Sequence, residues 1–409
     1  MAVPGYEILS RRLNPFRFNL QELGGALGDT GTLLPLMVAL IVINRLNATW
    51  VLVTVGLFYI ISGLYYRLPI PVQPLKAVAA IAIAYGLSSS VIGAAGIMMG
   101  VILLFLSMTN LIAVVVRLFP RAVVRGVQLS IGLVLLRRGV ELALSRQMFV
   151  SGSPRILGLE HWPVGVMLAL MALAVFILFK FMPLRNRGQF PPSLALLTFG
   201  LGTGIIFNTF PGFGKIGPAP PEITLPAAAD FWLALTVLVI PQLPLTLGNA
   251  VVGTWDTART YFGERAAKVT PRALTASMGL SNLAVGMLGA MPMCHGSGGL
   301  TAHYRLGART GGAALMIGGL LLLLGVLLGH AALPLLSIIP LAVLGTLLAI
   351  VGVYHALLIR DLKGFGNLAV AGVVGIVTIA LGNLAYGFAA GILLYYLLVL
   401  ARKAVKPAA

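Results

Sequence analysis

Long apolar runs joined by short polar connections make up most of this chain. A helix needs about 20 apolar residues to cross a bilayer, and the pattern predicts about fourteen segments, two of them short. We expect them near residues 23–45, 48–66, 74–86, 90–118, 121–144, 162–182, 192–209, 230–254, 271–290, 297–305, 311–330, 333–358, 366–382 and 384–401. The predicted fold class is an all-α polytopic membrane protein.

A polar, proline-rich run at residues 211–229 divides the predicted segments into two halves of about seven each. An odd number of crossings makes the second half enter the membrane from the opposite side, as in transporters built from inverted repeats. The sequence therefore predicts a 7+7 inverted repeat whose two halves are joined by an extracellular linker.

The third predicted segment of each half is interrupted at its start. Pro69, Pro71 and Pro74 precede a short apolar stretch in the first half, and residues 296–299 read Gly-Ser-Gly-Gly in the second. Paired interruptions of this kind point to the central site of a transporter. Because the free N–H groups and the dipole of a helix N-terminus attract anions, we expect two half-helices, segments 3 and 10, to begin at an anion site.

Polar side chains near these breaks are candidate anion ligands. Polar groups inside membrane segments are costly and usually face a cavity or a partner. Gln73 and Lys76 share one helical face, although Lys76 could instead extend toward the lipid headgroups. Thr246 could also serve only to join helices. The predicted substrate-binding residues are Gln73, Lys76, Gln242, Thr246, Asn249, His295, Gly296, Ser297, Gly298 and Gly299.

Asp29, Thr30 and His295 are candidates for coupling transport to a proton or sodium ion. A titratable group beside an anion site can carry a coupled proton. Two alternatives stay open: Asp29 could cap a break in its helix, and His295 could make a structural hydrogen bond.

Metal, cofactor and enzyme chemistry find no support in the sequence. The five histidines and the single cysteine, Cys294, lack the spacing of metal ligands. No HExxH or GxSxG pattern occurs. We expect no metal, no cofactor and no enzymatic activity.

The formal charge of +18 reflects membrane topology in our interpretation, because the basic residues fall in short loops and not in one patch that could bind nucleic acid. Only 9% of the residues are charged, against about a quarter in soluble domains. With the N-terminus in the cytoplasm, most basic residues lie on the cytoplasmic side, as the positive-inside rule requires. The exceptions are Arg45, Arg146, Arg155 and Lys215. We expect an integral protein of the cell (inner) membrane with both termini in the cytoplasm.

Four stretches resemble the molybdate transporter family, which is related to the sulfate permease (sulfate/anion transporter) superfamily. They are ELGGALGDTGTLLPLMVAL from residue 22, PIPVQPLKAVAA from residue 69, PQLPLTLGNAVVGT from residue 241 and MPMCHGSGGLTAHYRLGART from residue 291. The resemblance implies a core domain at residues 1–120 and 230–330 and a gate domain at 121–210 and 331–409. It places the substrate between the N-termini of the third and tenth segments.

The function implied by this resemblance is secondary active transport of a tetrahedral oxyanion by alternating access, with molybdate as the first candidate and tungstate as a further one. A sulfate or other small-anion permease and an anion channel stay open as alternatives, because molybdate and sulfate are both tetrahedral dianions. Partners besides the oxyanion and the lipid bilayer are a coupled proton or sodium ion and, as an open possibility, a second copy of the chain.

Overall fold

The computed structural model describes residues 14–405 except 110, 113, 115–118, 146, 150–163, 182–190, 208–211, 213, 214, 222 and 224. The first half contains α1 (Leu20–Ala26), η1 (Leu27–Asp29), α2 (Thr30–Val42), α3 (Ala48–Tyr66), β1 (Gln73–Pro74), α4 (Lys76–Tyr85), α5 (Ser89–Met108), α7 (Arg121–Ala143), α8 (Val164–Phe181) and α9 (Pro192–Ile206).

The second half begins with one long helical stretch that changes its winding along its length. It comprises α10 (Ala228–Leu233), η2 (Ala234–Val239), α11 (Ile240–Leu245), η3 (Thr246–Gly253), α12 (Thr254–Phe262) and η4 (Gly263–Ala266), of which η2 and η3 are π-helical. The later elements are α13 (Pro271–Met287), β2 (Met293–Cys294), α14 (Ser297–Arg305), α15 (Gly311–Ser337), α16 (Leu341–Ala356), η5 (Leu357–Asp361), α17 (Phe365–Leu381) and α18 (Leu384–Val405).

Eight helical stretches among the described residues are long and apolar enough to cross a membrane, as expected of an integral membrane protein. They are Leu20–Val42, Ala48–Tyr66, Ser89–Met108, Val164–Phe181, Ala228–Ala266, Gly311–Ser337, Leu341–Asp361 and Leu384–Ala401. Every predicted segment overlaps a helix, while the count of fourteen crossings stays a prediction. Basic residues such as Arg146 and Arg155, on which part of the predicted topology rests, lie outside the described residues.

Three predicted boundaries are wrong. The fourth segment was expected to reach residue 118, but α5 ends at Met108; the eighth was expected to end near 254, but its helical stretch continues to Ala266. The twelfth segment was expected to begin near residue 333, but α15 continues through Pro334 to Ser337 and α16 begins at Leu341. A proline inside a membrane helix removes one hydrogen bond without ending the helix when its neighbours pack against it. Pro340, which precedes α16 as its N-cap, marks the real boundary.

Helices from the two halves pack in pairs that small residues make possible. α15 packs against α3, α13 against α5 and α16 against α7. A Cβ atom built on Gly56 would lie 2.7 Å from the Gly318 carbonyl oxygen, and one on Gly93 would lie 2.8 Å from that of Gly286. Only glycine permits this approach, which is a common means of joining membrane helices. In the predicted inverted repeat, α3 corresponds to α13 and α5 corresponds to α15. The α3–α15 pair and the α13–α5 pair are therefore equivalent, which supports the predicted repeat.

Candidate functional site

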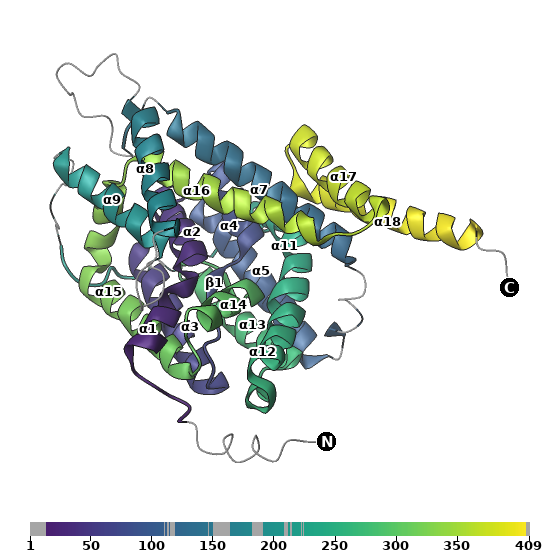
Figure 1. Ribbon diagram of the computed structural model, residues 1–409, viewed down its shortest axis with the longest axis horizontal. Coiled ribbons are helices and arrows are strands. Elements are labelled where there is room, and N and C mark those ends of the chain that lie inside the picture. Colours follow the sequence, from purple (N-terminus) through teal and green to yellow (C-terminus); the bar gives the residue numbers. More distant parts are fainter. Residues whose placement is uncertain are drawn as a thin grey trace.

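Two short strands meet at the centre of the molecule and hold the start of two short helices (Figure 1). β1 and β2 are antiparallel, with Gln73 opposite Cys294, and the Leu75 N–H donates to the Pro292 carbonyl oxygen over 2.9 Å. α4 follows β1 and α14 follows β2, so the N-termini of both helices lie beside the strand pair. α4 has 10 residues; at 1.5 Å per residue it spans about 15 Å of a hydrocarbon core of about 30 Å.

Gln242 occupies the N-terminus of α4. Its Oε1 accepts hydrogen bonds from the Ala77 N–H (2.8 Å) and the Val78 N–H (3.3 Å), and its Nε2 donates to Thr246 Oγ1 over 2.9 Å. Both ends of the Gln242 amide are therefore engaged within the protein, and so is the Thr246 hydroxyl. The structure places these two predicted ligands in a capping role, which leaves α4 with fewer free N–H groups than the sequence suggested.

The N-terminus of α14, in contrast, has no cap. Its N-cap residue is Gly296, which has no side chain, and the first internal hydrogen bond runs from the Leu300 N–H to the Gly296 carbonyl oxygen. No hydrogen bond from the described residues reaches the N–H groups of Ser297, Gly298 and Gly299. Three successive free donors at a helix N-terminus form a site suited to an anion.

The glycines at this end differ in what surrounds them. A Cβ on Gly299 would lie 2.5 Å from Asp29 Oδ2 and 2.7 Å from Gln73 Nε2, and one on Gly296 would meet Gln73 Oε1. These two glycines let the side chains of Asp29 and Gln73 lie directly against α14. Gly298 is exposed, and no atom lies within 4 Å of the position of its Cβ. Space for a ligand therefore lies on the Gly298 side of the helix.

Asp29 is buried beside this helix end at only 3% exposure. Gln73 Nε2 donates to both of its carboxylate oxygens, at 2.6 Å and 2.8 Å, and the half-buried Lys76 is close enough for its charge to act on Asp29. The structure thus brings together three of the predicted residues, but Gln73 and Lys76 do not share a helical face as expected, because Gln73 lies in β1 and α4 begins only at Lys76. Thr30 does not join them through its hydroxyl, which donates to the Leu27 carbonyl oxygen over 2.7 Å.

Asn249 lies within the π-helix η3 and contacts α14. Its Oδ1 accepts a hydrogen bond of 2.7 Å from Ser297 Oγ, and its Nδ2 lies 3.8 Å from the position of a Cβ on Gly296. Single π-helical turns are rare and often occur at functional sites. Asn249 therefore keeps an amide donor beside the start of α14, and its role as a substrate ligand stays a prediction.

His295 is enclosed on all sides. It is 0% exposed, its Nδ1 donates to the Pro71 carbonyl oxygen over 2.9 Å, and its Nε2 lies 3.0 Å from Ser277 Oγ. Its ring stacks on Phe58 and meets the edge of Tyr66. Both ring nitrogens have protein partners, so this arrangement favours the structural alternative for His295 over contact with a substrate.

Two asparagines that the sequence analysis did not single out hold the short elements in place. Asn282 Nδ2 donates to the Met293 carbonyl oxygen, and its Oδ1 accepts from the Met293 N–H, so it clamps β2. Asn44 Nδ2 donates to the carbonyl oxygens of Ala82 and Leu87 at the C-terminal end of α4. Asn282 is a lone amide inside an apolar segment, which was a usable signal, whereas Asn44 lies beside Arg45 and Asn47 at a segment end and gave none.

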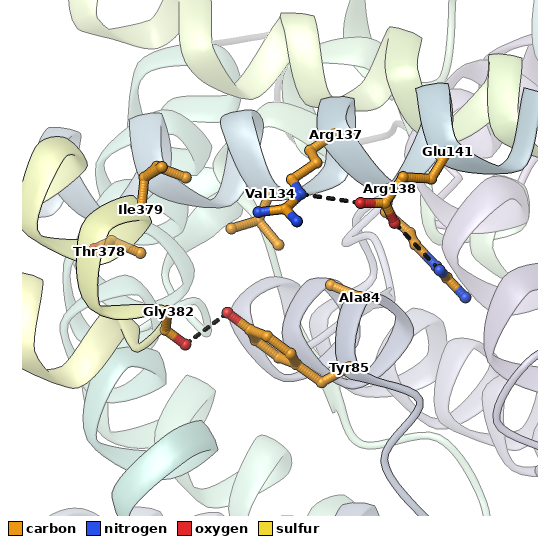
Figure 2. A pocket seen from close by; sticks show the side chains of 9 residues that line it. All are labelled: Ala84, Tyr85, Val134, Arg137, Arg138, Glu141, Thr378, Ile379 and Gly382. Atoms are coloured by element: carbon orange, nitrogen blue, oxygen red, sulfur yellow. Dashed lines mark hydrogen bonds and ion pairs between the residues drawn. The ribbon is translucent and has the colours of Figure 1, made fainter. Parts of the chain in front are cut away.

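The far end of α4, together with α7 and α17, lines a cavity of about 230 Å³ (Figure 2). Tyr85 OH donates to the Gly382 carbonyl oxygen over 2.6 Å. On the opposite wall, Glu141 pairs with Arg137 (2.9 Å) and Arg138 (3.3 Å), the local pairing expected from their spacing. The Tyr85 bond is thus a link between the predicted core and gate domains.

In the part of the chain that the structure describes, no three His, Cys, Asp or Glu residues group closely enough to hold a metal ion. Cys294 is buried, and its thiol faces the Pro74 carbonyl oxygen at 3.5 Å.

Comparison with known proteins places these features in a wider context. A family model described as "Molybdate transporter of MFS superfamily" matches residues 21–135 and 234–354, which include the short strands and helices of the site. Molybdate transporter 2 of Arabidopsis thaliana is 32% identical, over 96% of this chain and 90% of the relative. Molybdate transporter 1 of the same plant is 34% identical, over 94% and 89%.

Among solved structures, the transmembrane domain of a cyanobacterial bicarbonate transporter, BicA, has the same fold. It superposes with a TM-score of 0.63 at 20% identity and covers 91% of this chain and 96% of its own.

Proposed function

Because the chain belongs to the molybdate transporter family, we propose that it carries a tetrahedral oxyanion, with molybdate as the first candidate, across the membrane by alternating access. The observation that carries this proposal is the uncapped N-terminus of α14. Three free N–H groups and the helix dipole point to one place, which adjoins Asp29, a residue on which the charge of Lys76 acts.

The proposed ligands come from both short helices. The N–H groups of Ser297, Gly298 and Gly299 would replace part of the hydration shell of the anion, and Lys76 would supply a full positive charge. Asn249 Nδ2 adds a further donor. Gln242, Thr246 and His295 support the site by holding α4 and the strand pair in position.

Asp29 is the proposed coupling group. Its carboxylate lies against the helix end that would receive the anion, and two like charges in a low-dielectric setting repel each other. A proton on Asp29, or a sodium ion shared with the buried and unpartnered Gln73 Oε1, would remove that repulsion. Binding of the cation and of the oxyanion would then favour each other.

Alternating access requires the predicted core and gate domains to move relative to one another. We assign α1–α5 and α10–α15 to the core and α7–α9 and α16–α18 to the gate, with both termini in the cytoplasm. Gly298 is exposed at the start of α14, while the far end of α4 is tied to α17 through Tyr85. In the proposed mechanism, release of the Tyr85 bond accompanies the movement that changes the side from which the site is reached.

Uptake of labelled molybdate into proteoliposomes tests this function. We expect saturable uptake that unlabelled tungstate inhibits strongly and sulfate inhibits weakly. Lys76→Gln should reduce uptake. Lys363→Gln, a change at an exposed lysine far along the chain, should leave uptake intact. Conductance without saturation would identify a channel instead. Stronger inhibition by sulfate than by tungstate would assign the chain to the sulfate permeases in function.

A further inference from the structure

An apolar groove runs between α7, α8 and α16, away from the candidate site. It has a volume of about 340 Å³, and its lining is almost wholly apolar. Its floor is formed by small residues because the helices approach closely there: a Cβ on Gly139 would lie 2.5 Å from the Gly345 carbonyl oxygen. Ala143, Ala169 and Ala349 continue this floor. The groove is therefore a consequence of the close helix packing.

The groove opens toward lipid. α8, which forms one wall, is the least buried of the eight candidate spans, with 11% of its apolar window inside the protein. Leu170 and Leu173 of α8 and Val140 of α7 line the groove and are 62%, 40% and 45% exposed. In a membrane these side chains face acyl chains, which are the surrounding solvent.

A positive charge lies at one end of the groove. Tyr354 lines the groove, and the Lys180 ammonium lies 5.4 Å from the centre of its ring. Phe176 and Phe181 also surround this ammonium, at 5.8 Å and 5.4 Å. None of the ion pairs among the described residues involves Lys180. Lysine and aromatic residues together are typical of the membrane interface, where the headgroups lie.

We propose that this groove binds an anionic phospholipid, with one acyl chain between α7, α8 and α16 and the phosphate at Lys180. An apolar groove that ends at a cation with no carboxylate partner among the described residues complements an anionic amphiphile. The aromatic rings fix the ammonium at the depth of the headgroup. The inference does not depend on the identity of the transported anion.

Native mass spectrometry of the purified full chain tests the proposal. The protein is titrated with phosphatidylglycerol or phosphatidylcholine that carry identical acyl chains. We expect tighter binding of phosphatidylglycerol, and we expect Lys180→Gln to weaken it about five-fold, the effect of one basic residue near an anionic headgroup. Leu173→Trp, which fills the groove, should weaken binding of both lipids.

Matched variants separate the groove from general effects. Lys215→Gln removes an exposed lysine of the linker between the two halves, and Leu178→Trp places the same bulk on α8 outside the groove; both should bind lipid as the wild type does. Thermal unfolding shows whether each variant is folded, and Leu170→Trp replaces Leu173→Trp if the latter is not. Equal phosphatidylglycerol binding by wild type and Lys180→Gln would overturn the proposal. If Leu173→Trp removes a dimer of the protein but leaves lipid binding unchanged, the groove is a contact between two copies and the proposal is wrong. If oleate competes with phosphatidylglycerol equally well, the groove does not recognise a phospholipid.

Discussion

Gln73 and Asp29 form a buried pair that links the two halves of the candidate site: Gln73 Nε2 lies 2.6 Å and 2.8 Å from the two carboxylate oxygens of Asp29. Gln73 comes from β1, and the pair lies directly against Gly299 of α14. The start of α14 therefore has the carboxyl group of Asp29 beside its free N–H groups. Under the proposed function a transported dianion binds next to this carboxylate, so we expect Asp29 to be the point of coupling.

Asp29→Asn should separate binding from coupling. The amide removes the negative charge, so we expect tighter molybdate binding, by several-fold, and uptake that no longer responds to a proton or sodium gradient. Asp230→Asn is the matched control, because Asp230 pairs with Ser90 far from the site. Binding is measured by calorimetry and coupling by uptake under imposed gradients. Uptake that keeps its full gradient dependence in Asp29→Asn would assign coupling to another group.

Gly299→Ala and Gly298→Ala should have opposite effects on stability. The methyl group at 299 would lie 2.5 Å from Asp29 Oδ2, so we expect a loss of about 1–3 kcal/mol in the free energy of unfolding, the range for overpacking. The methyl group at 298 meets no atom within 4 Å, so unfolding should be unchanged while molybdate binding weakens. Thermal unfolding with and without molybdate measures both. Equal stability of the two variants would contradict the placement of Asp29 against α14.

Gln242 should be needed for the structure of α4 and not for contact with the substrate. Gln242→Leu leaves the N–H groups of Ala77 and Val78 without their acceptor, which costs about 1–3 kcal/mol for an unsatisfied buried group. Gln242→Glu keeps the acceptor but adds a negative charge, so it should remain folded and bind molybdate more weakly. Unfolding and binding assays on both variants test this. A stable Gln242→Leu variant that loses only binding would instead make Gln242 a direct ligand.

Tyr85→Phe should shift the balance between the two proposed states in which the site opens to opposite sides of the membrane. The hydroxyl links α4 to α17, and a net contribution of about 0.5–1.5 kcal/mol per hydrogen bond corresponds to a population change of about 2- to 10-fold. The rate at which an impermeant thiol reagent labels a cysteine introduced at Val134, in a Cys294→Ser background, reports opening of this cavity. Tyr386→Phe, at an exposed tyrosine of α18, is the control. Unchanged labelling would mean that the Tyr85 bond does not limit opening.

The local features of the site were predictable from the sequence because they depend on neighbouring residues. Three prolines before Lys76 and the glycines after His295 interrupt apolar segments, and both sites of interruption became short strands followed by short helices. The predicted boundary between α15 and α16 was wrong because Pro334 has the sequence pattern of a helix end. Whether a proline ends a membrane helix depends on the helices that pack against it.

Contacts between distant residues could not be predicted in this way. Gln242 caps α4 across 165 positions of the sequence, and a glutamine in an apolar helix has the same pattern whether it binds a ligand or a helix end. His295 is a similar case: its position next to the glycines suggested the site, but its ring points to Pro71 and Ser277. Only the packing of the two halves determines which side of each element faces the free N–H groups.

The most direct measurement of the central claim is a crystal structure of the protein with tungstate, whose tungsten atom gives a strong anomalous signal. We predict one peak beside the main-chain nitrogens of Ser297, Gly298 and Gly299, within reach of the Lys76 ammonium. A protein that binds tungstate but shows its peak elsewhere, such as between Arg137 and Arg138 in the cavity at the far end of α4, would contradict this account.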